Sequence, residues 1–166
     1  FRGLLAGLAG DLRHLDARIA ALDAHITQHL QHDPVARRLL AVCGIGPLTA
    51  SALASALGDG QAFSRGRDFA ASLGLVPRQH STGGRQRLLG ITKRGDGYLR
   101  KLLVHGARAV LQHAAKKSDP LSQWLNTLAL RKHPNVVIVA LANKMARLAW
   151  AMTRHQTPYN PALAAG

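Results

Sequence analysis

The sequence predicts a nearly all-α protein in which a long helical arm leads into one compact helical domain. Three observations support this prediction: 47% of the 166 residues are apolar, Leu and Ala recur at helical spacing through most of the chain, and Gly or Pro separates the helical segments. This apolar fraction suffices for a hydrophobic core at this length. Because no stretch shows a convincing alternating pattern, no strand is predicted.

A coiled-coil arm is predicted over residues 1–33. Apolar side chains recur there at alternating spacings of three and four residues, which is typical of a heptad seam. The seam consists of Leu5, Leu8, Leu12, Leu15, Ile19, Leu22, Ile26 and His29. An amphipathic helix packed on its own domain would show the same pattern, so both interpretations stay open. The chain begins at Phe1, without Met and inside the helical pattern, and we expect it to be part of a longer protein.

A helix-hairpin-helix-like element is predicted next. Asp33 and Pro34 end the arm and open a second helix, as its N-cap and first-turn residues. A turn containing Gly44 and Gly46 then leads into a small-residue helix that ends at Gly58. In a helix-hairpin-helix such glycines let backbone N–H groups approach a phosphate. An ordinary αα-hairpin with tight packing is the alternative.

The rest of the chain predicts a short helix over residues 63–73, a long basic Gly-rich loop and three further helices. The loop covers residues 78–97 and lacks apolar periodicity, so we expect a loop with or without a short hairpin. The later helices are expected over residues 98–115, 121–130 and 135–153. The expected organisation is therefore an arm over 1–33, a compact domain over 34–157 and a disordered tail over 158–166.

The charge is strongly basic and uneven. The formal net charge is +14, yet residues 1–33 hold three basic and four acidic residues, so the excess lies in residues 34–166. One-sided charge on a core-forming chain points to a polyanionic partner, and 16 of the 22 basic residues are Arg, whose planar fork suits phosphate. An Arg-rich composition that reflects a GC-rich genome is the alternative.

Several classes are disfavoured. No apolar run approaches the roughly 20 residues of a membrane span, and no membrane partner is expected. The single Cys43 argues against a disulfide framework and fits the cytoplasm. All eight acids are Asp and are scattered singly, whereas two-metal phosphoryl transfer needs clustered carboxylates. No metal site is therefore predicted in this chain; His25 and His29 lie one turn apart but lack a third ligand.

Covalent catalysis remains possible in the basic loop. A hydroxyl that attacks a phosphodiester needs a proton acceptor, and cations to stabilise the charged transition state. Ser81 lies between His80 and Thr82 with arginines on both sides, so it is the candidate nucleophile. A solvated basic loop with an incidental serine is the alternative. Tyr98 is a competing nucleophile, although its place in a predicted first helical turn favours packing.

Three stretches carry a resemblance to a known family. They are LLAVCGIGPLTASAL, FSRGRDFAASLGLVPRQHSTGGRQRLLGITKRGDGYLRKLLVHGARAVL and VALANKMARLAWAM, and they cover most of residues 39–153. The sequence resembles the C-terminal transposase domain of the IS-one-ten class of insertion sequences, which also includes the pilin-gene invertases. The resemblance implies that an N-terminal RuvC-like domain with a Mg²⁺-binding acidic cluster precedes this chain, joined by a coiled-coil arm.

The resemblance also implies a function in DNA transposition. Members of the family resemble RNA-guided recombinases: a noncoding bridge RNA pairs with donor and target DNA, a tetramer synapses them, and a serine links covalently to DNA. We therefore expect DNA, bridge RNA and further copies of the chain, as a dimer or tetramer, as partners in the bacterial cytoplasm at the nucleoid. The chain alone is expected to bind nucleic acid but to catalyse little. A non-catalytic DNA- or RNA-binding and oligomerisation module is the alternative.

Site residues follow from the same comparison. The family's Ser-Ser/Thr-Gly-Gly pattern falls on Ser81, Thr82, Gly83 and Gly84, which favours Ser81 as the nucleophile. A shorter Gln-Ser-Gly version, aligned without a gap, would instead place the serine on Thr82. The residues expected to hold phosphate are Arg78, His80, Gly83, Gly84, Arg85, Arg87, Lys93, Arg94 and Arg100 around the loop, with Gly44 and Gly46 in the helix-hairpin-helix-like turn.

Overall fold

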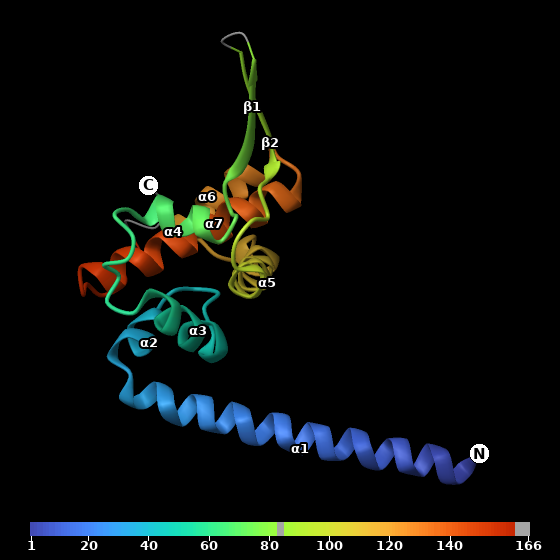
Figure 1. Cartoon of the computed structure of the whole chain (residues 1–166). Helices are drawn as coiled ribbons and strands as arrows, with labels where there is room; N and C mark the ends of the chain where they lie inside the picture. The colour runs from blue at the N-terminus through green and yellow to red at the C-terminus, as the bar shows by residue number, and fades with distance from the viewer. Residues whose placement is uncertain (83–84, 162–166) are drawn as a thin grey trace.

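The computed structural model describes residues 1–82 and 85–161, without the side chains of residues 81, 82, 85 and 86. Over this part of the chain it contains seven helices and one two-stranded antiparallel sheet, which confirms the mostly helical fold (Figure 1). The elements are α1 (Arg2–His32), α2 (Pro34–Leu39), α3 (Pro47–Leu57), α4 (Gly66–Ser72), β1 (Pro77–Thr82), β2 (Arg85–Ile91), α5 (Gly97–Ala114), α6 (Pro120–Ala129) and α7 (Pro134–Arg154).

The core is built around α7. This helix packs against α4, α5 and α6, and its Leu141 and Met145 lie fully buried beside Phe69, Leu103 and Leu125 of the other helices. By length and composition alone α7 could cross a membrane, but half of its apolar window is buried inside the protein. It is therefore best described as the core helix of the domain.

The arm helix α1 extends far from the body (Figure 1). Only its C-terminal turns pack on the domain, where Leu30 is buried and Ile26 contacts the core. The seam from Leu5 to Leu22 is exposed, with side chains 49–63% accessible. An amphipathic helix packed on its own domain thus describes only the end of the arm, and pairing of the exposed seam with another helix stays a prediction.

The acidic residues of the domain are engaged locally. Asp33, Asp96 and Asp119 cap the N-termini of α2, α5 and α6, as the side chain of each accepts backbone N–H bonds. The hydrogen bond from the Ser122 hydroxyl is the main reason why the pKa of Asp119 lies below its ordinary value. Asp59 accepts from a turn N–H, and Asp68 lies 3.5 Å from Arg65. The predicted start of the second helix at Asp33 and Pro34 is confirmed.

The turn between α2 and α3 packs closely on α5. Gly44 has a φ of +90°, and a Cβ there would lie 2.8 Å from a Val110 methyl and 3.0 Å from the Gly106 carbonyl oxygen. A Cβ on Gly106 would collide with the Gly44 carbonyl oxygen. Gly46, by contrast, is exposed and has open space around it. Gly44 therefore has a packing role in the fold, and phosphate binding at this turn stays a prediction.

The general expectation of no strand is wrong, and of the two forms left open for residues 78–97 the structure has the hairpin. Most of the predicted loop folds as a hairpin of β1 and β2, which projects from the body (Figure 1). A two-residue Gly-Gly spacer between two runs of residues is a hairpin signal in the sequence. The many charged and polar residues on both runs hide the period of two, because neither face is apolar enough to mark a core side.

Candidate nucleic-acid interface

The base of the hairpin is fixed to the body by backbone contacts. The backbone N–H groups of Thr92, Lys93 and Asp96 donate to carbonyl oxygens of residues 72–76, over 2.9–3.2 Å. Two glycines with positive φ allow this approach, since a Cβ on Gly74 would collide with the Arg94 backbone and one on Gly95 with the Ser72 carbonyl. The segment that leaves β2 is therefore locked against the end of α4.

Two long helices also hold this base through side chains. Arg100 of α5 donates from Nη1 to the Leu73 carbonyl at 2.8 Å and to the Arg94 carbonyl at 3.3 Å. Asn143 of α7 donates from Nδ2 to the Leu75 carbonyl at 3.1 Å. Arg100, expected among the phosphate-binding residues, thus uses Nη1 to position the hairpin.

The strand register distributes the candidate residues over two faces. His80 pairs with Arg87 and Thr82 with Arg85, while Ser81 pairs with Gln86. Directly paired positions share a face, and neighbouring positions in a strand alternate. By register, Thr82 shares a face with His80 and the arginines, and Ser81 lies on the other. The register therefore separates Ser81 from His80 by face.

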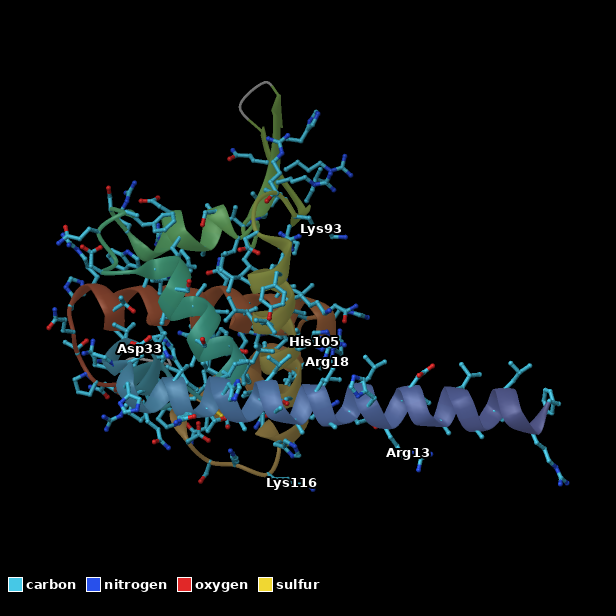
Figure 2. All side chains as sticks on the ribbon, turned by 60° about the horizontal axis from the view of Figure 1, so that its bottom comes forward. Arg13, Arg18, Asp33, Lys93, His105 and Lys116 are labelled. Atoms are coloured by element: carbon cyan, nitrogen blue, oxygen red, sulfur yellow. The ribbon has the colours of Figure 1, made fainter. Side chains whose placement is uncertain are left out.

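The remaining predicted cations surround the hairpin. Arg78, Arg87, Lys93 and Arg94 are exposed, as is His80. Lys93 lies at the foot of the hairpin, whereas Arg13 and Arg18 lie on the arm (Figure 2). Two predicted site residues, Gly83 and Gly84, lie outside the described residues, and of Ser81, Thr82 and Arg85 the structure describes the backbone.

Further functional candidates on α7 were missed by sequence reasoning. Lys144 and Arg147 line both a pocket of about 330 Å³ beside α4 and one of about 780 Å³ at the foot of the hairpin. Lys144 Nζ lies 4.9 Å from the centre of the Trp124 ring. Burial, together with the charge of Arg147, lowers the pKa of Lys144. In the sequence, Lys144 and Arg147 are two cations three residues apart in a largely apolar helix. Such a pattern is typical of a solvent-exposed helix face and does not indicate a pocket.

The described residues do not make a metal site. Among residues 1–82 and 85–161 no group of three or more His, Cys, Asp or Glu side chains could hold an ion. The acids from Asp33 onward instead serve as caps, a turn acceptor and an ion-pair partner. The described residues therefore do not fit the Mg²⁺ that the family resemblance implies for the RuvC-like domain.

Comparison with known proteins agrees with the resemblance seen in the sequence. The chain is similar to a probable family 20 transposase of Pseudomonas aeruginosa, at 56% identity over 95% of this chain and 47% of the relative. It is 47% identical to the transposase for insertion sequence element IS1328 of Yersinia enterocolitica, with the same coverage of both chains. A pilin gene-inverting protein of Moraxella bovis is 27% identical over 90% of this chain and 48% of the relative.

The chain spans about half the length of these curated relatives. The family model described as "Transposase IS116/IS110/IS902 family" matches residues 36–122, which is just over half of the 166 residues. The match runs from α2 to the start of α6 and includes the whole hairpin. On this evidence of sequence, the chain belongs to the IS116/IS110/IS902 family of transposases.

Proposed function

We propose that this chain is the DNA-binding and strand-exchange part of a transposase, and that Ser81 is its nucleophile. The observation that carries the proposal is the hairpin, which projects from the body on a fixed base and holds Ser81 one residue before the end of β1. Exposed cations follow the hairpin, while the acids of the domain are engaged in caps and local pairs. Such a projection suits entry between DNA strands, with phosphate attracted along it.

The proposed step is a transesterification. The Ser81 hydroxyl loses its proton and attacks a DNA phosphorus, so the Oγ–P bond forms while the P–O bond to one deoxyribose oxygen breaks. The departing oxygen takes up a proton. A deoxyribose hydroxyl of the second strand then loses its proton and attacks the same phosphorus, the Oγ–P bond breaks and the serine oxygen takes up a proton, so the number of phosphodiester bonds is unchanged. Arg78, Arg87 and Arg94 offset the charge that builds on the phosphate oxygens.

The proton acceptor for Ser81 comes from outside this chain in our proposal. The register puts His80 on the opposite face of the hairpin from Ser81, and the described residues hold no carboxylate cluster. A general base must reach the proton that it removes. Dependence on another domain or another copy would explain why we expect the chain alone to bind DNA and to catalyse little.

Thr82 is the second candidate nucleophile. It shares a face with His80 and Arg87 by register, so a proton acceptor and a cation lie on its own side. A non-catalytic module that binds DNA or RNA and promotes oligomerisation is the alternative from another class. It is compatible with the same basic hairpin, and the exposed seam of α1 suits its assembly role.

The RNA partner and the oligomeric state are proposals that rest on the family resemblance. We propose that the protein acts with a noncoding bridge RNA, as a dimer that pairs into a tetramer when two DNA sites are brought together. The exposed seam of α1 supports self-association, because pairing with a second helix would bury leucines that recur at heptad spacing. We further propose action in the bacterial cytoplasm, at nucleoid DNA, where Cys43 stays reduced.

Trapping of covalent adducts tests the nucleophile. The full-length transposase, with its RNA and end-labelled donor DNA, is denatured during reaction, and labelled protein is measured for wild type, Ser81→Ala, Thr82→Ala and Tyr98→Phe. We expect adducts from all but Ser81→Ala, while DNA binding by each variant stays within about twofold. Adducts from Ser81→Ala would contradict the assignment. Loss in Thr82→Ala alone would move the nucleophile to Thr82, and DNA binding without adducts in wild type would favour the non-catalytic module.

A further inference from the structure

A groove lies along α7 at the foot of the hairpin. Its deeper part is the pocket of about 780 Å³ between the hairpin, α6 and α7, which we call the Trp124 pocket. The apolar residues that line it are Leu75, Leu89, Ile91, Trp124, Val136 and Val139. The shallower pocket of about 330 Å³ continues the groove toward Arg65 and Arg67 at the start of α4. Lys144 and Arg147 line both parts and so stand between them.

The charges along the groove all have one sign. Arg78 and Lys93 flank the Trp124 pocket, Lys144 and Arg147 stand in the middle, and Arg65 and Arg67 follow. Among the residues that line the two pockets none is acidic. Four of these six cations are arginines, whose planar guanidinium groups suit the phosphates of one strand. A polyanion complements this positive charge, whereas a protein segment with few acidic residues would not. We therefore expect a polyanion as the occupant.

The interior of the Trp124 pocket is apolar and partly open to water. Leu89 is 39% and Val136 52% accessible, and the Trp124 ring is half-buried. Exposed apolar surface beside a concave site is typical of a binding surface rather than of a packed core. A nucleobase matches it, because its two faces are apolar while its edge is polar.

Polar groups for a base edge are also present. Asn143, which lines the pocket, donates from Nδ2 to the Leu75 carbonyl, and its amide also carries an acceptor oxygen. The Asn135 amide, on an exposed residue of the first turn of α7, offers a donor and an acceptor. Burial lowers the pKa of Lys144, so its ammonium group is already partly desolvated in the fold. A ligand that covers Lys144 therefore removes less water from it than from a fully exposed lysine.

We infer that this groove binds a single-stranded segment of nucleic acid, with one unstacked base in the Trp124 pocket and the flanking phosphates on the cations of α4, α7 and the hairpin foot. A duplex keeps its bases stacked inside, so it can touch the cations but cannot fill the pocket. The inference rests on the proposed function in one respect, namely that nucleic acid is the ligand. DNA and RNA share this chemistry, and the experiment separates them.

The test compares single strands with duplexes on the full-length protein. Anisotropy of labelled 12-nucleotide DNA, RNA and duplex DNA is measured for wild type, Val136→Asp, Val136→Asn and Trp124→Ala. Val136 lies in the first turn of α7, where an acid stabilises a helix, so Val136→Asp introduces a carboxylate without threatening the fold. Leu130→Asp, at a side chain 86% accessible and outside the pocket lining, is the matched control.

We expect Val136→Asp and Trp124→Ala to weaken single-strand binding at least about tenfold, with Val136→Asn intermediate because it removes apolar wall without adding charge, Leu130→Asp near wild type and duplex binding changed less than about twofold. The strand type that binds more tightly identifies the natural source. Equal losses for single strand and duplex would overturn the base pocket, as would unchanged single-strand binding. Unchanged binding with a shift in sedimentation would assign the groove to a second copy. Wild type that binds no nucleic acid at all would instead remove the proposed function.

Discussion

Asn143 donates a hydrogen bond from Nδ2 to the carbonyl oxygen of Leu75, 3.1 Å away, and thereby ties the core helix α7 to the start of the hairpin. The two residues are 68 positions apart in the chain, so the bond joins separate parts of the fold. Together with Arg100, which donates to the carbonyls of Leu73 and Arg94, it sets the direction in which the hairpin leaves the body.

Removal of this bond should loosen the hairpin foot. Asn143→Leu keeps the side-chain volume but leaves the Leu75 carbonyl without its partner, so we expect a loss of about 1–3 kcal/mol in the free energy of unfolding. Urea unfolding measures the loss, and faster hydrogen exchange at the Thr92 and Lys93 amides locates it. Asn135→Ala, on an exposed residue, should change stability by less than about 0.5 kcal/mol. Equal effects of the two variants would contradict the role of Asn143.

The glycine contact between the α2–α3 turn and α5 should be essential for packing. Gly106→Ala would push a Cβ into the Gly44 carbonyl, and we expect a cost of about 2 kcal/mol or more in thermal unfolding. Gly46→Ala, in the same turn but with open space around it, should cost less than about 1 kcal/mol. If Gly46→Ala also weakens duplex DNA binding several-fold, the turn holds phosphate as predicted; unchanged binding would leave it as an ordinary αα-hairpin.

Self-association should depend on the exposed seam of α1. Leu15→Asp combined with Leu22→Asp places two charges in that seam and should dissociate any dimer that the arm makes, as measured by analytical ultracentrifugation. Ala17→Asp combined with Ala24→Asp has the same spacing and charge off the seam and should leave the assembly intact. An oligomer that survives the seam variant would assign association to the globular domain.

Duplex DNA affinity should fall steeply with salt. Each phosphate neutralised contributes about 0.9 to the slope of log affinity against log salt, so Arg87→Ala with Arg94→Ala should make the slope shallower by about 2. Arg2→Ala with Arg13→Ala removes the same charge from the near-neutral arm and should leave the slope unchanged. Titrations at several salt concentrations measure both. A slope near zero for wild type would rule out the electrostatic account of the domain.

Helix positions could be predicted from the sequence because their signals are local. Asp33, Asp96 and Asp119 each precede a helix and accept hydrogen bonds from backbone N–H groups two or three residues further along. Pro34 begins α2 and Gly58 follows the end of α3. The hairpin could be left open as an alternative to a loop but not chosen, because its stability comes from pairing between runs whose residues are polar on both faces. The Gly-Gly spacer at residues 83–84 was the one signal that could have predicted it.

The candidate site could be predicted only in part. The family pattern identified Ser81 and Thr82, but only the strand register separates them into different faces, with His80 beside Thr82. The Trp124 pocket could not be predicted, because its walls come from segments between Leu75 and Arg147 that meet only in the folded chain. Arg100 was expected to hold phosphate, and its use as a tie between backbone carbonyls became visible only with the fold.

The position of the covalent bond to DNA tests the central proposal most directly. The full-length protein is trapped during reaction, the DNA is trimmed with nuclease, and tryptic peptides are fragmented by mass spectrometry. Cleavage after Arg78 and Arg85 gives the peptide QHSTGGR, which contains both hydroxyl candidates. We predict a nucleotide on Ser81 within this peptide. A nucleotide on Thr82, on Tyr98 or on any other residue would contradict the assignment.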